Sequence, residues 1–263
     1  MRQKIAFFDI DGTLIDVKNG LLEPTKETVE ALHDFQNKGN YIVAASARGT
    51  LPDSLNQINF DGLILSDGHY IEFNNEPIID NVFSLDELTF LEHTIQKYTD
   101  SYIFGGFHGT WFSTHDSDLI YKQELEYGDV STISQKPLAQ NITRIRANSM
   151  TPLFQSLELL NACYKELPDM WSINKYDTGL LRMDIHRQGY EKGTACQYLA
   201  ELLNIHEEDR YAMGDGYNDI EMLSLIQNSV AMGNAVDESK SIAKHTTLSV
   251  LENGVAIFLK SIK

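Results

Sequence analysis

The chain has 263 residues, which is enough for one large domain or two of moderate size. Its hydrophobic content of 42% is ordinary for a globular protein, and 38 acidic residues against 21 lysine and arginine residues give a net charge of −17. Such a negative surface repels nucleic acids and anionic membranes, which argues against both as partners.

The first part of the chain alternates predicted strands and helices. Residues 5–8 form a short continuous apolar run, typical of a buried strand in a parallel sheet. Residues 24–35 have helical spacing of apolar side chains, and 41–45 and 63–65 are two further apolar runs. This alternation predicts an α/β fold.

The middle of the chain has a different pattern. Short strands are predicted at 144–146, 171–173 and 180–185, with a helix over 153–167 between them. These elements lack the long buried runs of the first part. We therefore expect a separate α+β module over residues 84–184.

The parallel pattern returns in the last part of the chain. A helix is predicted at 194–203, and strands at 211–213 and 229–232. Residues 1–83 and 185–263 are therefore predicted to form one Rossmann-like parallel-sheet core that is interrupted by the inserted module.

The sequence favours a cytoplasmic location. Cys163 and Cys196 cannot form a disulfide framework of the kind found in secreted domains. Asp9 and Asp11 interrupt the apolar run near the N-terminus, so no signal peptide fits there. No stretch is long and apolar enough to span a bilayer.

Two aspartates follow the first predicted strand, in the segment Asp9-Ile-Asp11-Gly-Thr. Ligands of open α/β sheets bind at the carboxyl ends of the strands, where these side chains are placed. With Gly12 freeing the turn, the two carboxylates can share Mg²⁺ while one oxygen faces a substrate. A strand that simply ends in a polar turn would place the same residues here.

A second acidic segment, Gly-Asp-Gly-Tyr-Asn-Asp, follows the predicted strand 211–213 and covers residues 214–219. Its carboxylates are oxygen ligands, which hard cations prefer. Asp219 replaces the third glycine of a dinucleotide-binding loop, where its charge would repel a pyrophosphate. The alternative is a turn that caps a helix, because Asp and Asn are good N-cap residues.

Two more polar residues stand at the ends of predicted elements. Lys192 begins a helix, where the helix dipole disfavours a positive charge, and such local conflicts tend to mark functional sites. Ser46 ends the strand 41–45, where its hydroxyl and nearby N–H groups could hold a phosphate. Taken singly, an ordinary surface lysine and an ordinary strand-ending serine are the simpler interpretations.

The order of these segments is more specific than any one of them. Asp-x-Asp-Gly-Thr, strand–Ser, an insertion, Lys-Gly and Gly-Asp-Gly-x-Asn-Asp follow one another along the chain. In this order the sequence resembles the haloacid dehalogenase-like superfamily, and specifically its Cof-type phosphatases, over nearly the whole chain. Residues 230–235 and 252–256 also resemble that family.

The resemblance implies a role for each matching residue. Asp9 matches the nucleophile that forms an aspartyl-phosphate, and Asp11 matches the general acid/base whose backbone carbonyl also binds the metal. The other matches are the metal ligand Asp215, its supporting neighbour Asp219, and the phosphate-binding residues Ser46, Lys192 and Asn218. The insertion 84–184 matches the large α+β cap, of type C2, and is expected to control access to the nucleophile.

These residues suffice for phosphoryl transfer. Negative charge builds up on the phosphoryl oxygens, and Mg²⁺ and Lys192 supply the opposing positive charge. Mg²⁺ also keeps Asp9 ionised among its acidic neighbours, while Asp11 protonates the leaving alcohol and later deprotonates the attacking water. We therefore expect a magnesium-dependent phosphatase of small phosphorylated metabolites.

Two positions depart from the family pattern. The second motif usually reads Thr/Ser-Gly-Arg, and here Ala47 replaces the glycine, which reduces backbone freedom. His69-Tyr70 stands where many relatives have Asn-Gly-Ala after the third strand, which leaves open what this loop presents to a substrate.

Two other functions stay open at this stage. A phosphotransferase or mutase would pass the phosphoryl group from Asp9 to a second sugar phosphate instead of to water. A non-catalytic protein that binds phosphorylated metabolites could use the same fold, although it would not need the nucleophile. The sequence predicts neither the identity of the substrate nor the oligomeric state.

Overall fold

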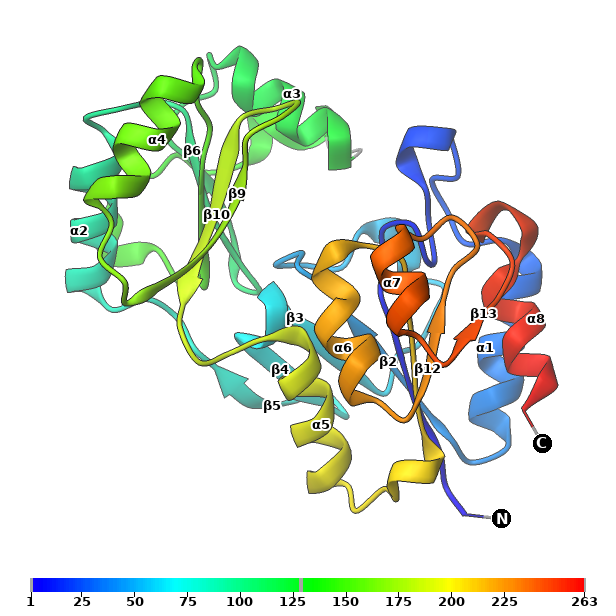
Figure 1. Cartoon of the computed structure of the whole chain (residues 1–263). Coiled ribbons are helices and arrows are strands. Elements are labelled where there is room, and N and C mark those ends of the chain that lie inside the picture. The colour runs from blue at the N-terminus through cyan, green and yellow to red at the C-terminus, as the bar shows by residue number, and fades with distance from the viewer. Residues whose placement is uncertain (1, 128–129, 263) are drawn as a thin grey trace. The chain divides into compact units, whose positions relative to one another are not determined.

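The computed structural model describes residues 2–127 and 130–262. The chain forms two compact units (Figure 1), here called the core unit, Met1–Asp80 with Tyr190–Lys263, and the insert unit, Asn81–Gly189. The insertion predicted at 84–184 falls within the insert unit, and it includes residues 128–129, which lie outside the described residues.

The core unit is built on a sheet with the strand order β13-β12-β11-β1-β2-β3-β4-β5. The strands are β1 Ile5–Phe8, β2 Tyr41–Ala45, β3 Gly62–Leu65, β4 Tyr70–Phe73, β5 Glu76–Asp80, β11 Arg210–Gly214, β12 Asn228–Ala231 and β13 His245–Thr246. From β13 through β3 neighbouring strands pair in parallel, whereas β4 and β5 run antiparallel. The fold is therefore α/β with a parallel-sheet core, as predicted.

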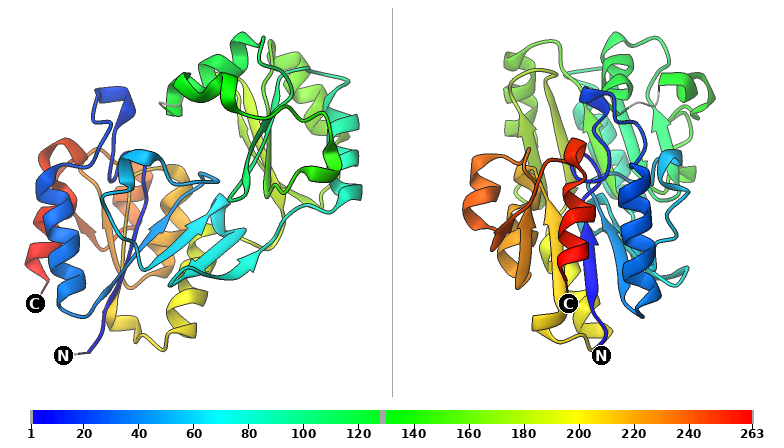
Figure 2. Two further views of the ribbon diagram at one scale, coloured as in Figure 1. Left: turned by 180° about the vertical axis from the view of Figure 1, so that it is seen from behind. Right: turned by 90° about the vertical axis from the view of Figure 1, so that its right-hand side faces the viewer.

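Helices lie on both faces of this sheet (Figure 2). They are α1 Lys26–Asn37, α5 Lys192–Leu202, α6 Ile220–Leu225, α7 Asp237–Ile242 and α8 Gly254–Ser261. Successive side chains of β1 point to opposite faces, because the side-chain period of a strand is two. Phe8 belongs to the apolar cluster that contains Leu32 of α1 and Leu259 of α8, whereas Phe7 packs in the cluster of Leu199 of α5 and Met222 of α6. Both faces of β1 are thus buried, which explains its continuous apolar sequence.

The insert unit contains an antiparallel sheet with the order β7-β6-β8-β10-β9. Its strands are β6 Tyr102–Gly106, β7 Gly109–Phe112, β8 Ser149–Pro152, β9 Trp171–Tyr176 and β10 Arg182–Arg187, and its helices are α2 Leu85–Ile95, α3 Asp118–Tyr127 and α4 Leu157–Glu166. Phe104 of β6 packs with Leu91 of α2 and Leu160 of α4, whereas Ile103 packs with Ile120 of α3. Antiparallel strands with helices packed on the sheet make this unit an α+β structure.

The prediction of a strand at 144–146 is wrong. Ile142–Arg144 form a short 3-10 turn, in which Asn141 Oδ1 accepts the backbone N–H of Thr143. Such local side-chain hydrogen bonds compete with strand pairing. The strand in this part of the chain is β8, which begins at Ser149.

Both cysteines are free, buried thiols. Burial raises the pKa of Cys163 to about 12, which keeps this thiol protonated and unreactive. Across residues 2–127 and 130–262, no helix combines the length and apolar character that crossing a bilayer requires.

Candidate active site

The residues predicted for catalysis gather where parallel strands of the core sheet end. Asp9 follows β1, Ser46 follows β2 and Asp215 follows β11. The backbone N–H of Asp9 donates to the carbonyl oxygen of Met213 at 2.9 Å, so the strand pairing continues into the site. The carboxylate of Asp9 is therefore carried by a backbone that is still hydrogen-bonded to the neighbouring strand β11, not by a free loop.

Gly12 allows the loops after β1 and β11 to approach each other. Its φ of +91° lies in the left-handed region, which glycine adopts without strain. A Cβ at this position would lie 2.1 Å from Asp215 Oδ2, closer than any real contact. Glycine is thus required here both for its backbone angle and for its lack of a side chain.

Lys192 connects Asp9, the predicted nucleophile, to the second acidic segment. Its buried Nζ donates to Asp9 Oδ1 and Asp219 Oδ1, each at 2.8 Å. Burial lowers the pKa of the Lys192 ammonium, but the charges of Asp219 and Asp9 outweigh it and raise the pKa above its usual value. Lys192 therefore stays charged beside Asp9.

The carboxylate of Asp9 is harder to keep charged. Burial raises its pKa well above the usual value, the charge of Asp219 adds to this effect, and Lys192 opposes it. Burial and Asp219 likewise raise the pKa of Asp215 to about 7. A further positive charge at this place would stabilise both carboxylates in their ionised forms.

The same carboxylates can supply the ligands for such a charge. Asp9, Asp215 and Asp219 each offer one oxygen, and these oxygens lie within 4.8 Å of one another. Three carboxylates against the single ammonium of Lys192 leave an excess of negative charge. Oxygen ligands without histidine or cysteine fit a hard divalent cation such as Mg²⁺ better than zinc.

Asp219 mainly organises its own loop. Its Oδ2 accepts the backbone N–H groups of Asp215 and Gly216, each at 2.9 Å, and its Oδ1 accepts from Lys192. The residue is completely buried. Both oxygens of Asp219 thus have protein donors.

The carboxylate of Asp11 lies apart from this group and pairs with Arg48. Arg48 Nε donates to Asp11 Oδ2 and Nη2 donates to Oδ1, both at 2.7 Å. This two-bond arrangement is the strong form of an Arg–carboxylate pair. Sequence reasoning named Arg48 only as the last residue of the second motif and did not predict this contact.

The two other predicted phosphate ligands differ in their surroundings. Ser46 is buried, and its Oγ accepts the backbone N–H of Arg48 at 3.1 Å. Asn218 is exposed. Its Oδ1 lies so close to Gly216 that a Cβ added to this glycine would be 2.5 Å from the oxygen. Ser46 is therefore fixed by its loop, while Asn218 stands at the surface.

A residue from another helix resolves the unfavourable position of Lys192. Glu191, the N-cap residue of α5, makes no side-chain capping bond. Instead, Glu221 Oε2 of α6 accepts the backbone N–H of Gly193 at 2.8 Å. A carboxylate at the helix N-terminus offsets the conflict between the helix dipole and the lysine.

A strained loop after β3 supports the Ser46 segment. Ser66, Asp67 and Gly68 have consecutive positive φ angles of 49°, 51° and 94°. Non-glycine residues in this region cost on the order of 1–3 kcal/mol each, so other contacts must hold them there. The backbone N–H of Ser66 donates to Arg48 O at 2.9 Å, and that of Asp67 donates to Ser46 O at 3.2 Å. The loop that departs from the family pattern therefore braces the second motif.

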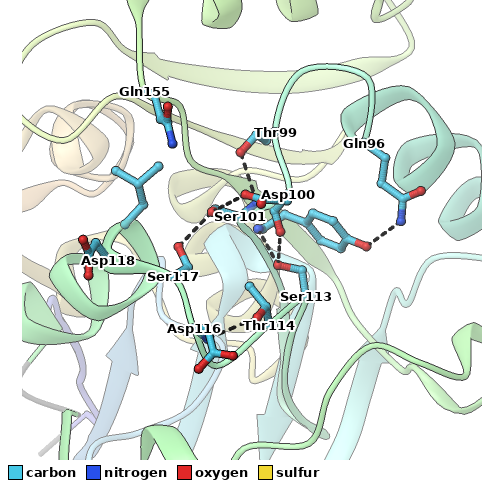
Figure 3. A pocket seen from close by; sticks show the side chains of 12 residues that line it. Gln96, Thr99, Asp100, Ser101, Ser113, Thr114, Asp116, Ser117, Asp118 and Gln155 are labelled. Atoms are coloured by element: carbon cyan, nitrogen blue, oxygen red, sulfur yellow. Dashed lines mark hydrogen bonds between the residues drawn. The ribbon is translucent and has the colours of Figure 1, made fainter.

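The insert unit has a hollow of its own, of about 600 Å³, between the start of β6 and the segment after β7 (Figure 3). Its lining is mostly hydroxyl and carboxylate groups. Ser117 Oγ donates to Ser101 Oγ at 2.8 Å, and Ser113 Oγ donates to the carbonyl oxygen of Asp100 at 2.6 Å. None of the residues predicted for catalysis lines it, and these hydroxyls bond to the protein itself, so we assign it no function.

Comparison with known proteins agrees with this geometry. The haloacid dehalogenase-like hydrolase family matches residues 6–259. The phosphatase YwpJ of Bacillus subtilis (strain 168) is 28% identical, over 98% of this chain and 99% of its own length. The 5-amino-6-(5-phospho-D-ribitylamino)uracil phosphatase YitU of the same strain is 24% identical, over 96% of this chain and 94% of its own.

A solved structure shows the same arrangement of elements. The sugar phosphatase BT4131, of haloacid dehalogenase subclass IIB, has a TM-score of 0.79 and 25% identity, over 98% of both chains. The similarity thus covers the core unit and the insert unit together. With a family match over almost its whole length, this chain belongs to the haloacid dehalogenase-like hydrolases.

Proposed function

We propose that this hydrolase is a magnesium-dependent phosphatase that acts on a small phosphorylated metabolite through an aspartyl-phosphate on Asp9. The observation that carries the proposal is the buried Lys192 ammonium 2.8 Å from Asp9 Oδ1. A fixed positive charge beside the attacking carboxylate stabilises the charge of a phosphoryl group in transfer. In a protein that only bound phosphate, a carboxylate at this place would repel the ligand and weaken its binding.

The proposed ligands of Mg²⁺ are the carboxylates of Asp9 and Asp215 and the backbone carbonyl of Asp11. When bound, the cation supplies positive charge that keeps Asp9 ionised and offsets the charge of the phosphoryl oxygens. Asp219 keeps the Asp215 loop in place through its two backbone hydrogen bonds.

Phosphate binding is assigned to the other predicted residues. Lys192 offers its ammonium, Ser46 its hydroxyl, and Asn218 its side-chain amide. Together with backbone N–H groups they offer hydrogen-bond donors to the phosphoryl oxygens, while a bound Mg²⁺ would offset the nearby carboxylates, as an anionic substrate requires on a protein of net charge −17.

The reaction has two steps, and both use Asp11. An oxygen of Asp9 forms a bond to phosphorus while the ester P–O bond breaks, and the leaving oxygen takes a proton from Asp11. Water then attacks phosphorus, gives its proton to Asp11, and the bond from phosphorus to Asp9 breaks. Inorganic phosphate and free Asp9 result.

Arg48 sets a condition on this mechanism. Its two hydrogen bonds hold the Asp11 carboxylate when no substrate is present. Asp11 must give up at least one of them, so that this oxygen can carry the proton that Asp11 donates to the leaving oxygen. Arg48 thus holds the proposed acid/base in a defined position when no substrate is bound.

The names of two similar proteins support the proposed substrate class. A sugar phosphate or a similar phosphomonoester is the proposed substrate, since the names of BT4131 and YitU both point to small phosphate esters. We assign the insert unit the role of a cap that recognises the leaving group. A cytoplasmic location belongs to this proposal, because both cysteines are free thiols.

The experiment is a screen of the purified protein against phosphorylated metabolites, scored by release of inorganic phosphate without any added acceptor. Mg²⁺ should support release from at least one compound, and a chelator should abolish it. Full activity of the metal-free enzyme would contradict the proposal. Transfer that occurs only after a second sugar phosphate is added would identify a phosphotransferase instead.

A further inference from the structure

Asn234, which follows β12, lies between two loops of the candidate site. Its Nδ2 donates to the carbonyl oxygen of Gly12 at 2.8 Å and to Asp215 Oδ2 at 3.2 Å. Its Oδ1 accepts the backbone N–H of Val250 at 2.9 Å. Because Val250 supplies a donor, the amide oxygen must face it, and the NH₂ group must face the two acceptors.

The backbone around Asn234 is held in place on both sides of the residue. A Cβ on Gly233 would lie 2.6 Å from the backbone nitrogen of Ser249, so this close approach requires glycine. Two residues beyond Asn234, the backbone N–H of Val236 donates to the carbonyl oxygen of Asp215 at 3.0 Å. The position of the Asn234 side chain is therefore set by its loop.

A neutral amide suits a carboxylate that also has to bind a cation. A lysine or arginine at this position would neutralise Asp215 and compete with a metal ion. Asparagine orients one carboxylate oxygen through a hydrogen bond and leaves the negative charge in place. Thr13 Oγ1 lies 3.5 Å from Asp215 Oδ1, so Asn234 is the closer of these two side-chain donors.

We propose that Asn234 is a positioning residue that holds Asp215 in the orientation in which this carboxylate binds a divalent cation. The inference rests on the proposed function, since it concerns the same metal site. Hydrogen-bond partners of metal ligands change metal affinity by roughly 10–100-fold when they are removed. Asn234 therefore acts on the affinity for Mg²⁺ and not on contacts with the phosphate group.

The test is calorimetric titration of the full-length protein with Mg²⁺ in the absence of substrate. For Asn234→Ala and Asn234→Ser, Kd should rise about tenfold or more, and the increase in Tm that Mg²⁺ produces should shrink. At saturating Mg²⁺, KM for a hydrolysed phosphoester should stay close to that of the wild type.

Asn228→Ala is the matched control. Asn228 Nδ2 also donates to two backbone carbonyls, those of Glu208 and Arg210, at 2.9 Å each. It therefore loses a comparable number of hydrogen bonds on substitution, but it makes no contact with Asp215. Its Kd for Mg²⁺ should equal that of the wild type.

An unchanged Kd in either folded Asn234 variant would overturn the assignment while leaving the phosphatase proposal intact. A wild type that binds no Mg²⁺ would overturn the assignment and the proposed metal dependence together. If the wild type binds Mg²⁺ and the variants bind it more weakly, the assignment of Asn234 is supported. A metabolite screen that yields no phosphate would count against the proposed function but not against this assignment.

Discussion

Charge is unevenly distributed at the centre of the site. Asp9, Asp215 and Asp219 face the single ammonium of Lys192, since Arg48 is engaged by Asp11. Without a cation, the repulsion between carboxylates opposes folding. Function and stability therefore make different demands on these residues, as is common at active sites.

Replacing Asp9 by Asn should affect catalysis and stability in opposite directions. The change removes the attacking charge and one source of repulsion while it keeps the shape of the side chain. We expect kcat to fall by about 10⁴-fold or more, as for loss of a covalent nucleophile. The Tm of the metal-free protein should not fall, which thermal unfolding would measure.

Asp34→Asn is the control for this variant, because it makes the same change of charge on an exposed residue of α1. It should leave kcat unaltered. Near-normal turnover by Asp9→Asn would exclude the covalent mechanism.

Residue-level reasoning from the sequence found the acidic residues and Lys192, but it missed their supporting partners. Lys192 was visible because a lysine at a helix start conflicts with the helix dipole. Glu221 and Asn234 gave no such signal. Each acts on a residue that is distant in the sequence, as Asn234 does on Gly12, so even the family resemblance of residues 230–235 implied no role for Asn234.

At the scale of elements, the site depends on how closely two strand-ending loops approach. Gly12→Ala should weaken both folding and catalysis, because the new Cβ would overlap the carboxylate of Asp215. Gly20→Ala is a matched control, since Gly20 has a similar φ of +82° and nothing within 4 Å of its added Cβ.

Backbone strain alone should cost both variants roughly 1–2 kcal/mol of unfolding free energy. Gly12→Ala should lose more unfolding free energy than this. It should also lose most of the phosphatase activity, whereas Gly20→Ala should retain it. Denaturant unfolding and phosphate release measure the two effects. Equal losses in the two variants would show that the approach of Asp215 to Gly12 is not critical.

In the insert unit, Glu87 links the first helix to the last strand. Its carboxylate accepts the backbone N–H of Ser84 at 2.6 Å in a capping box, and it accepts two hydrogen bonds from Arg187, of which that from Nε measures 2.9 Å. Burial raises the pKa of Glu87, but the hydrogen bonds from Arg187 and Ser84 outweigh it and lower the pKa below 4.5.

This shift predicts how the stability depends on pH. A carboxylate whose pKa is lower in the folded state stabilises the fold above pH 4.5, and this contribution is lost as the pH falls through its folded-state pKa. The difference in Tm between the wild type and Glu87→Gln should therefore be largest near neutral pH and should narrow below pH 4.5. Glutamine preserves the capping box, so a difference that does not change with pH would mean that the ion pair with Arg187 contributes nothing.

Elements with their own local signals were predictable, and others were not. The buried strands β1 and β2 have uninterrupted apolar sequences, and their predicted bounds agree with the structure. The segment at 144–146 has one apolar residue between two charged ones, but Arg144 ends a 3-10 turn in which Asn141 accepts a competing local hydrogen bond. Whether a short segment forms a strand depends on its partners in the sheet, and the sequence of the segment itself does not identify those partners.

At the scale of the whole molecule, two units divide the labour in the proposed function. A chimera of this core unit with the corresponding insertion of BT4131 should acquire the substrate preference of that sugar phosphatase. Its need for Mg²⁺ and Asp9 should stay as in the parent, because the proposed catalytic residues are all in the core unit. Rates of phosphate release from a common metabolite panel would measure both properties.

If the chimera kept the preference of the parent, the insert unit would be no more than a lid. Specificity would then have to come from loops of the core unit, such as residues 66–70. The sequence indicated the insertion because the spacing of apolar runs changes and then returns. It could not indicate a substrate, since the side chains that read a leaving group follow no common pattern.

The central position of β1 also determines when the site becomes complete during synthesis. Asp9 is synthesised before Lys192, its partner in the ion pair, which lies 183 residues later in the chain. One edge of β1 can pair early with β2, but the other must wait for β11 to emerge from the ribosome. A nascent chain therefore carries Asp9, the proposed nucleophile, before Lys192 is available, and in the proposed mechanism hydrolysis requires that α5 and β11 have joined the core unit.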